Sequence, residues 1–214
     1  MFSRRHPFLF FLLSLCTICA SALVIISLVI TIGLGSLREP GLHAGGKNLV
    51  GVVEVTGIIY ESDDIIHQIK EFRENDSVKA ILLRINSPGG TVGPAQEIYR
   101  EIQKTIPTKK VVASMGTMAA SGGYYIAAAA DGIMANPGTI TGSIGVIMSF
   151  PDYRELLGKI GVKTEVVKSG QYKDLGSSSR ELSVADRELL QGMIDDVHAQ
   201  FVQAISAGRN LPIE

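Results

Sequence analysis

The chain has 214 residues and a nearly balanced charge, with 20 Lys and Arg against 21 Asp and Glu. This length has room for one globular domain beside an apolar N-terminal stretch, and two full domains would not fit comfortably. Without a basic run, or basic residues interleaved with aromatic ones, nucleic acid is not expected as a partner. Both cysteines, Cys16 and Cys19, lie in the N-terminal stretch, so the domain can carry neither an internal disulfide nor a cysteine-based metal site.

The N-terminal stretch is long enough for a membrane anchor. Residues 8–34 contain no Asp, Glu, Lys or Arg, and as a helix they would extend about 40 Å. Two arginines precede them, so the positive-inside rule predicts a cytoplasmic N-terminus over 1–7 and an extracytoplasmic domain. A cleaved signal peptide is the alternative, because 20–22 (Ala-Ser-Ala) resembles a cleavage site, although apolar residues continue beyond it. We therefore expect a single-pass protein of the cell inner or plasma membrane.

Residues 35–48 are rich in glycine and lack apolar periodicity, which predicts a linker. The globular domain is expected over 49–214. It contains short β-branched runs, several of them apolar throughout, as is typical of strands that are buried on both faces of a parallel sheet. These strands are expected at 50–55, 80–85, 111–113, 133–135, 144–148 and 164–167.

Helical patterns lie between the expected strands. The alternation of strand and helix predicts an α/β fold with parallel strands. A last amphipathic helix should begin after Ser183, because apolar residues then recur every three or four positions and Asp186 is placed to complete a capping box. The earlier helices are expected at 63–74, 94–106, 121–130 and 152–160.

A glycine-rich turn, Asn-Ser-Pro-Gly-Gly at 86–90, directly follows an expected strand and precedes a helix. Two adjacent glycines let backbone N–H groups approach a ligand closely, so the turn can form half of an oxyanion hole. Taken alone, the motif is better explained as a tight strand-to-helix connection.

Ser121 follows another expected strand, at the point where a helix should begin. A serine in this position is accessible to a ligand, and the N–H of Gly122 can stabilise the oxyanion that forms when Ser121 Oγ attacks a carbonyl group. The alternative is an N-cap serine that leads a closely packed helix of small residues. The segment is not a G-x-S-x-G nucleophile elbow, because Ala119 stands at the first glycine position.

A nucleophilic serine needs a base, and the histidines are poorly placed for that role. His6 precedes the apolar stretch, His43 lies in the linker, and the other two lie on expected helices. Lysine is the other base used with serine, provided that burial lowers its pKa toward neutrality. Lys173 follows the strand expected at 164–167 on a glycine-containing loop and could reach a site at the strand ends. As an isolated residue it would be read as a solvated surface lysine, and only its combination with Ser121 favours a dyad.

Four motifs follow one another along the chain: NSPGG at 86–90, MAASGGYYIA at 118–127, NPGTITGSIGV at 136–146 and KSGQYKD at 168–174. With these motifs, the stretch 49–209 resembles the signal peptide peptidase A family of membrane-bound serine peptidases, within the Clp protease/crotonase superfamily. The resemblance implies a repeated β-β-α type core with parallel strands, preceded by one N-terminal transmembrane helix.

The resemblance also implies a role for each candidate residue. Ser121 would be the nucleophile and Lys173 the general base, Gly89 and Gly122 would donate to the oxyanion, and Ser143 would help to position the lysine amine. It further implies a homo-oligomer in which serine and lysine meet between subunits, apolar peptide substrates such as signal peptide remnants, and no metal or organic cofactor.

Two other functions stay open. An acyl-CoA-binding enzyme of the crotonase type would need an acidic pair near the glycine turns and a cytoplasmic location, and it would give Ser121 and Lys173 no role. A non-catalytic membrane-anchored scaffold or binding module is the second alternative. It is suggested by the C-terminus, because members of the family continue past Gly208-Arg209 into a further strand-and-helix segment.

Overall fold

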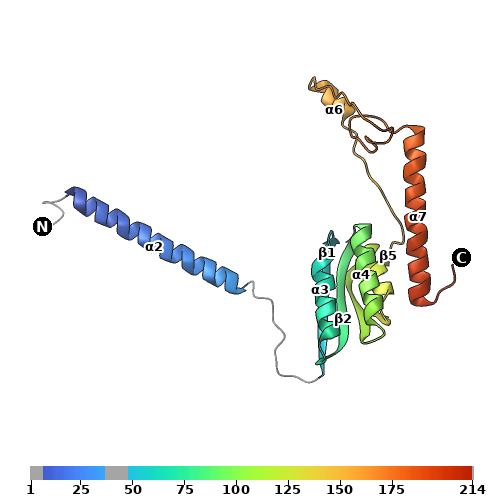
Figure 1. The fold of residues 1–214 in the computed structure, drawn as a ribbon, viewed down its shortest axis with the longest axis horizontal. Coiled ribbons are helices and arrows are strands. Elements are labelled where there is room, and N and C mark those ends of the chain that lie inside the picture. The colour runs from blue at the N-terminus through green and yellow to red at the C-terminus, as the bar shows by residue number, and fades with distance from the viewer. Residues whose placement is uncertain (1–6, 37–47, 214) are drawn as a thin grey trace. The chain divides into compact units, whose positions relative to one another are not determined.

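The computed structural model describes residues 7–36 and 48–213 and, within the first range, the side chains of residues 8, 11 and 15–27 (Figure 1). The chain divides into two compact units, Met1–Gly46 and Lys47–Glu214. The predicted N-terminal segment at 1–7 and linker at 35–48 fall mainly on residues outside the described part, so both stay predictions.

The predicted anchor at 8–34 coincides with helix α2 (Pro7–Ser36). Pro7 occupies the first helical position, which proline favours because the N–H it lacks would have no partner inside the helix. Within the described residues, no helix is long and apolar enough to cross a membrane. The membrane anchor therefore stays a prediction.

The second unit is built on a five-stranded sheet in which every pair of neighbouring strands is parallel. Four strands lie in the order β1-β2-β3-β4, and a fifth, β5, also pairs with β3. The expected α/β fold with a parallel sheet is confirmed. The strands are β1 (Leu49–Ile59), β2 (Val78–Gly90), β3 (Lys110–Ala120), β4 (Gly132–Met134) and β5 (Ile140–Gly142).

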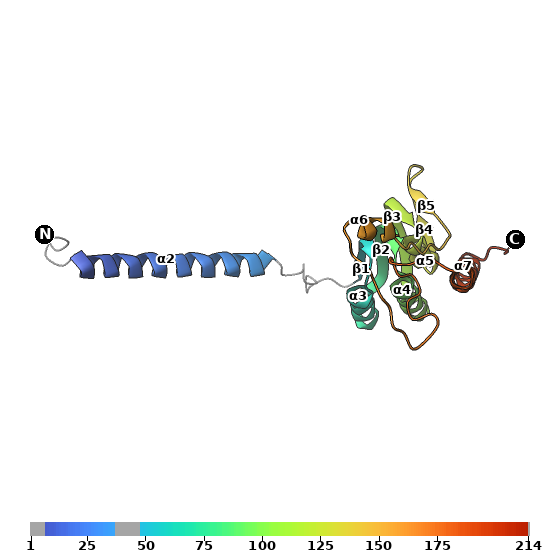
Figure 2. The ribbon, with the colours of Figure 1, turned by 90° about the horizontal axis from the view of Figure 1, so that it is seen from above.

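Three helices cover one face of this sheet: α3 (Asp63–Glu74), α4 (Val92–Thr105) and α5 (Gly122–Ala128) (Figures 1 and 2). Strands β1 to β4 are neighbours in chain order, and crossovers between parallel strands are right-handed, so the connecting segments all lie on the same side. The core between sheet and helices includes the fully buried Leu83 and Ile98. Burying such a side chain contributes about 1.5–3 kcal/mol.

Helix α7 (Val184–Arg209) joins this core through its C-terminal half, where Phe201 and Ile205 are buried against α5. The Tyr99 hydroxyl donates to the Ala204 carbonyl at 3.0 Å and fixes the same part of the helix to α4. At the other end the predicted capping box is confirmed, because the Ser183 and Asp186 side chains each accept a hydrogen bond from the other residue's backbone N–H.

The strands predicted at 144–148 and 164–167 are wrong. Both stretches are irregular, and a short strand, β5 (Ile140–Gly142), forms just before the first of them. Apolar β-branched residues favour an extended chain, but a strand also requires a neighbour whose N–H and C=O groups pair with its own. The helix predicted at 152–160 is confirmed in a shorter form, α6 (Arg154–Lys159).

Candidate active site

Ser121 connects β3 to α5 in a strained backbone conformation. Its φ is 50° and its ψ is −122°, a combination that residues with a Cβ rarely adopt and that costs about 1–3 kcal/mol. Both of its backbone groups are held: the N–H donates to the Gly142 carbonyl at 2.8 Å, and the carbonyl accepts from the Tyr125 N–H at 2.9 Å. A strained residue that its surroundings fix in this way is typical of a functional site.

The segment 86–90, predicted as a turn that follows a strand, is instead the last part of β2, where Gly89 and Gly90 pair with β1. This segment, the glycine turn, lies directly against Ser121, although the two are about thirty positions apart in the sequence. Gly89 has φ +97°, and a Cβ placed on it would lie 2.6 Å from the Gly122 nitrogen and 2.9 Å from the Ser121 Cβ. A Cβ on Gly123 would lie 3.0 Å from the Ser87 carbonyl oxygen. These glycines are required because the two backbone segments approach too closely for any side chain.

The two glycines of the turn differ in their position relative to the cavity beside Ser121. The N–H of Gly89 donates to Ser87 Oγ at 3.0 Å, while the fully buried Ser87 hydroxyl donates to the Gly57 carbonyl at 2.6 Å. Gly90, rather than Gly89, lines the cavity beside Ser121, together with Gly122. The assignment of Gly89 as an oxyanion donor stays a prediction, and Gly90 is a second candidate at the same turn.

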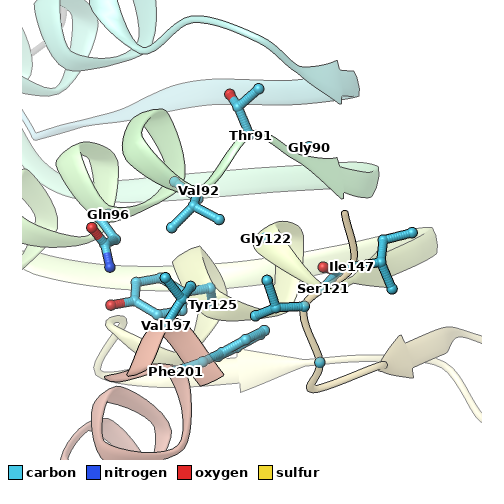
Figure 3. Close-up of a pocket in the computed structure, with 13 residues that line it drawn as sticks. Gly90, Thr91, Val92, Gln96, Ser121, Gly122, Tyr125, Ile147, Val197 and Phe201 are labelled. Carbon is cyan, nitrogen blue, oxygen red and sulfur yellow. The ribbon is translucent and has the colours of Figure 1, made fainter. Parts of the chain in front are cut away.

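The cavity beside Ser121 has a volume of about 110 Å³ and a mixed lining, in which apolar side chains lie beside polar groups that include Thr91 and Gln96 (Figure 3). The Tyr125 and Phe201 rings lie 5.0 Å apart between centroids and form one wall, and Tyr99 stacks behind Tyr125 at 4.9 Å. Burial raises the pKa of the Tyr125 phenol, so this wall stays uncharged at neutral pH. The apolar lining residues are Val92, Ala95, Tyr125, Val146, Ile147, Val197 and Phe201.

The sequence did not identify the contribution of α7 to this cavity. Val197 and Phe201 fit the apolar face of an amphipathic helix, and residues with that spacing are normally assigned to the core. In the structure Phe201 is buried and Val197 is half-buried, and the spacing of the two residues does not distinguish them from core residues.

Lys173 does not line the cavity. It is exposed on the turn-rich segment 169–176, and its backbone N–H donates to the Gly170 carbonyl at 3.3 Å. In Figure 1 the segment that includes α6 lies near the N-terminal end of α7, whereas the sheet lies beside the C-terminal half of that helix. Ser143 is also exposed, but it directly follows Gly142, the acceptor of the Ser121 N–H.

The structure thus brings Ser121, Gly89 and Gly122 together and leaves Lys173 elsewhere. This grouping can do part of the chemistry of acyl transfer, because it offers a hydroxyl and backbone N–H groups beside a cavity. In the described part of the chain, no group of His, Cys, Asp or Glu residues could hold a metal ion.

The chain is similar to known protein families. The chain matches the model of Peptidase family S49 over residues 103–214, more than half of its length, and the model of Clp protease over residues 54–139. The two matches overlap in the segment that contains Ser121.

Several proteins are similar to this chain. A Synechocystis sp. protein named as a candidate protease is 48% identical over 170 residues, which cover 78% of this chain and 61% of that protein. A candidate signal peptide peptidase SppA of Enterococcus faecium is 34% identical over 197 residues, which cover 84% of this chain and 56% of that protein. Serine protease SPPA, chloroplastic, of Arabidopsis thaliana is 35% identical over 189 residues, which cover 86% of this chain and 28% of that protein. The chain therefore spans between about a quarter and about three fifths of these relatives.

Proposed function

Because the chain belongs to peptidase family S49, we propose that it is a serine endopeptidase with Ser121 as its nucleophile. The observation that carries this proposal is the strained Ser121 backbone, held between the glycine turn and β5 at the edge of a cavity. A core-packing serine would have no need of such a conformation, whereas a nucleophile must be presented to its substrate in a fixed orientation.

In the proposed reaction, Ser121 Oγ attacks the carbonyl carbon of the scissile peptide bond as its proton passes to a base. The negative charge on the carbonyl oxygen is stabilised by the N–H of Gly122 and by an N–H of the turn that contains Gly89 and Gly90. The proton then goes to the leaving amine, the C–N bond breaks, and an ester to Ser121 remains. Water hydrolyses this ester and restores the free serine.

We assign the base to Lys173 of a neighbouring copy of the chain. The segment that carries Lys173 is tied to the start of α7 through Asp186, whereas the cavity is lined by Val197 and Phe201 of the same helix. These positions are 11 and 15 residues beyond Asp186, or about 16–22 Å along the helix axis. That separation is far greater than a lysine side chain can span. It supports a homo-oligomer in which each site takes its serine and its lysine from different subunits.

The proposed substrates are apolar peptides, of which signal peptide remnants are one class. The aliphatic and aromatic side chains of the cavity, such as Val92, Val197 and Phe201, are suited to an aliphatic side chain next to the scissile bond. The apolar stretch at 8–34 would anchor the protein in the cell membrane, with its catalytic domain outside the cytoplasm and Ser143 assisting Lys173. The name of the Enterococcus faecium relative, a signal peptide peptidase, supports this substrate class.

Hydrolysis of a fluorogenic apolar peptide by the detergent-solubilised full chain tests the proposal. Ser121→Ala and Lys173→Ala should each abolish turnover while remaining folded. If the two residues act between subunits, an equal mixture of the variants, dissociated and reassembled together, should regain about a quarter of the wild-type activity, since a quarter of randomly formed sites contain both residues. Full activity in either single variant would refute the dyad. A mixture that stays inactive, with reassembly verified, would refute its formation between subunits.

A further inference from the structure

An ion-pair network surrounds the residue next to Lys173. Asp174 accepts a hydrogen bond from Lys168 Nζ at 2.6 Å, and Arg180 binds the same carboxylate through two atoms, Nε at 2.8 Å and Nη2 at 3.0 Å. The remaining arm of the Arg180 guanidinium, Nη1, donates to Oδ2 of Asp186. A single guanidinium therefore joins the loop of Lys173 to the first turn of α7.

The two carboxylates of this network are largely shielded from solvent. The Asp174 and Asp186 side chains are only 10% and 4% exposed, and hydrogen bonds from Arg180, the largest cause in both cases, hold the pKa of each carboxylate well below its usual range. Isolated surface ion pairs contribute little, but bidentate pairs in a network fix geometry as well as charge.

Asp186 also belongs to the capping box of α7, so its carboxylate has two tasks. The same Oδ2 atom accepts from the Ser183 N–H at 2.9 Å and from Arg180. One oxygen atom therefore takes part both in capping the helix and in holding the loop. Further along, α7 contributes Val197 and Phe201 to the cavity of Ser121.

We propose that Arg180 is a positioning residue for the general base: by bridging Asp174 to Asp186, it fixes the loop that carries Lys173 to the N-terminus of α7. This inference rests on the proposed function, since it gives Arg180 a role through Lys173. Arg180 does not line the cavity beside Ser121.

Arg154 provides a matched control on the same part of the chain. It also bridges two carboxylates, those of Asp152 and Glu181. Those acids are 53% and 79% exposed, and neither is adjacent to Lys173 in the sequence. Arg154→Gln therefore removes an arginine with two ion pairs and leaves the bridge to α7 in place.

The experiment compares kcat and KM of the full-chain oligomer for the fluorogenic apolar peptide between pH 6 and 10. Arg180→Gln should lower kcat about tenfold or more, because a base displaced by about 1 Å loses most of its effect. KM should change less than about twofold, because the cavity is untouched. Arg180→Lys should recover only part of kcat, since a lysine cannot bind one carboxylate through two atoms. The acidic limb of the pH profile should move in Arg180→Gln but not in Arg154→Gln.

Asp174→Asn is a second variant in case Arg180→Gln does not fold, because it breaks the bridge on the loop side and leaves the capping box intact. It should show the same selective loss of kcat. A wild-type kcat and pH profile in folded Arg180→Gln or folded Asp174→Asn would overturn the inference, as would an equal loss in Arg154→Gln. Activity in Lys173→Ala would instead refute the proposed function, so the two failures are distinguishable.

Discussion

Replacing Ser121 with glycine should stabilise the folded domain while abolishing hydrolysis. At φ 50° and ψ −122°, a residue with a Cβ is strained by about 1–3 kcal/mol, and glycine is not. Part of this gain, about 0.4–1 kcal/mol, is lost because glycine gives the unfolded chain more conformational freedom. The free energy of unfolding should therefore be roughly 0.5–2 kcal/mol higher in Ser121→Gly than in Ser121→Ala.

Alanine is the matched comparison because both variants lack the hydroxyl group and differ only in the Cβ. Thermal unfolding followed by circular dichroism should give a Tm roughly 1–8 °C higher for the glycine variant. Neither variant should hydrolyse peptide. If the alanine variant were equally stable or more stable, the backbone of Ser121 would not be strained, and the main structural argument for its catalytic role would fail.

Three further predictions concern the glycine turn, the cavity and the start of α7. Gly89→Ala should lower both activity and Tm, because Gly89 has φ +97° and the added Cβ would lie 2.6 Å from the Gly122 nitrogen. Gly138→Ala should change neither, because the space around Gly138 is open. Val197→Ala should shift preference toward a larger apolar side chain by about tenfold in kcat/KM, measured with a peptide series; an unchanged preference would place the specificity pocket elsewhere. Folding lowers the pKa values of Asp174 and Asp186. The two ionised carboxylates therefore stabilise the folded domain above about pH 4, and this stabilisation is lost as the pH falls through their pKa values in the folded state. Denaturant unfolding of the wild type should therefore show a loss of stability below about pH 4 that is smaller in Asp186→Asn, and identical acid dependence in both would contradict this.

The parts of the fold that depend on residues close together in the sequence could be predicted from the sequence. The helix after Ser183 follows from local apolar spacing and a capping box, and the strands before 86–90 and Ser121 follow from buried β-branched runs. The strands predicted at 144–148 and 164–167 have the same local signal, but their formation depends on a partner elsewhere, which no local pattern encodes.

The candidate site divides in the same way. Ser121 and the glycine turn were found because each has a distinctive local motif, and the contact between them follows from both lying at the carboxyl ends of adjacent parallel strands. The strained backbone of Ser121 could not be foreseen, because it depends on the hydrogen bond to Gly142. The distance of Lys173 from the cavity was also hidden, because it depends on which end of α7 its loop contacts.

The hydrogen bond from the Ser121 N–H to Gly142 of β5 also limits when the site can form during synthesis, because Gly142 must first have been added to the chain. Strands β1 to β3 and their helices can begin to pair once residues up to about 120 have left the ribosome, since domains fold as their segments emerge, at about 5–20 residues per second. The acceptor that holds Ser121 lies on Gly142, and Thr141 secures the same strand by donating to the Ala119 carbonyl at 2.8 Å. Ser121 therefore reaches this backbone conformation only after the chain beyond it has emerged, when most of the sheet is already in place.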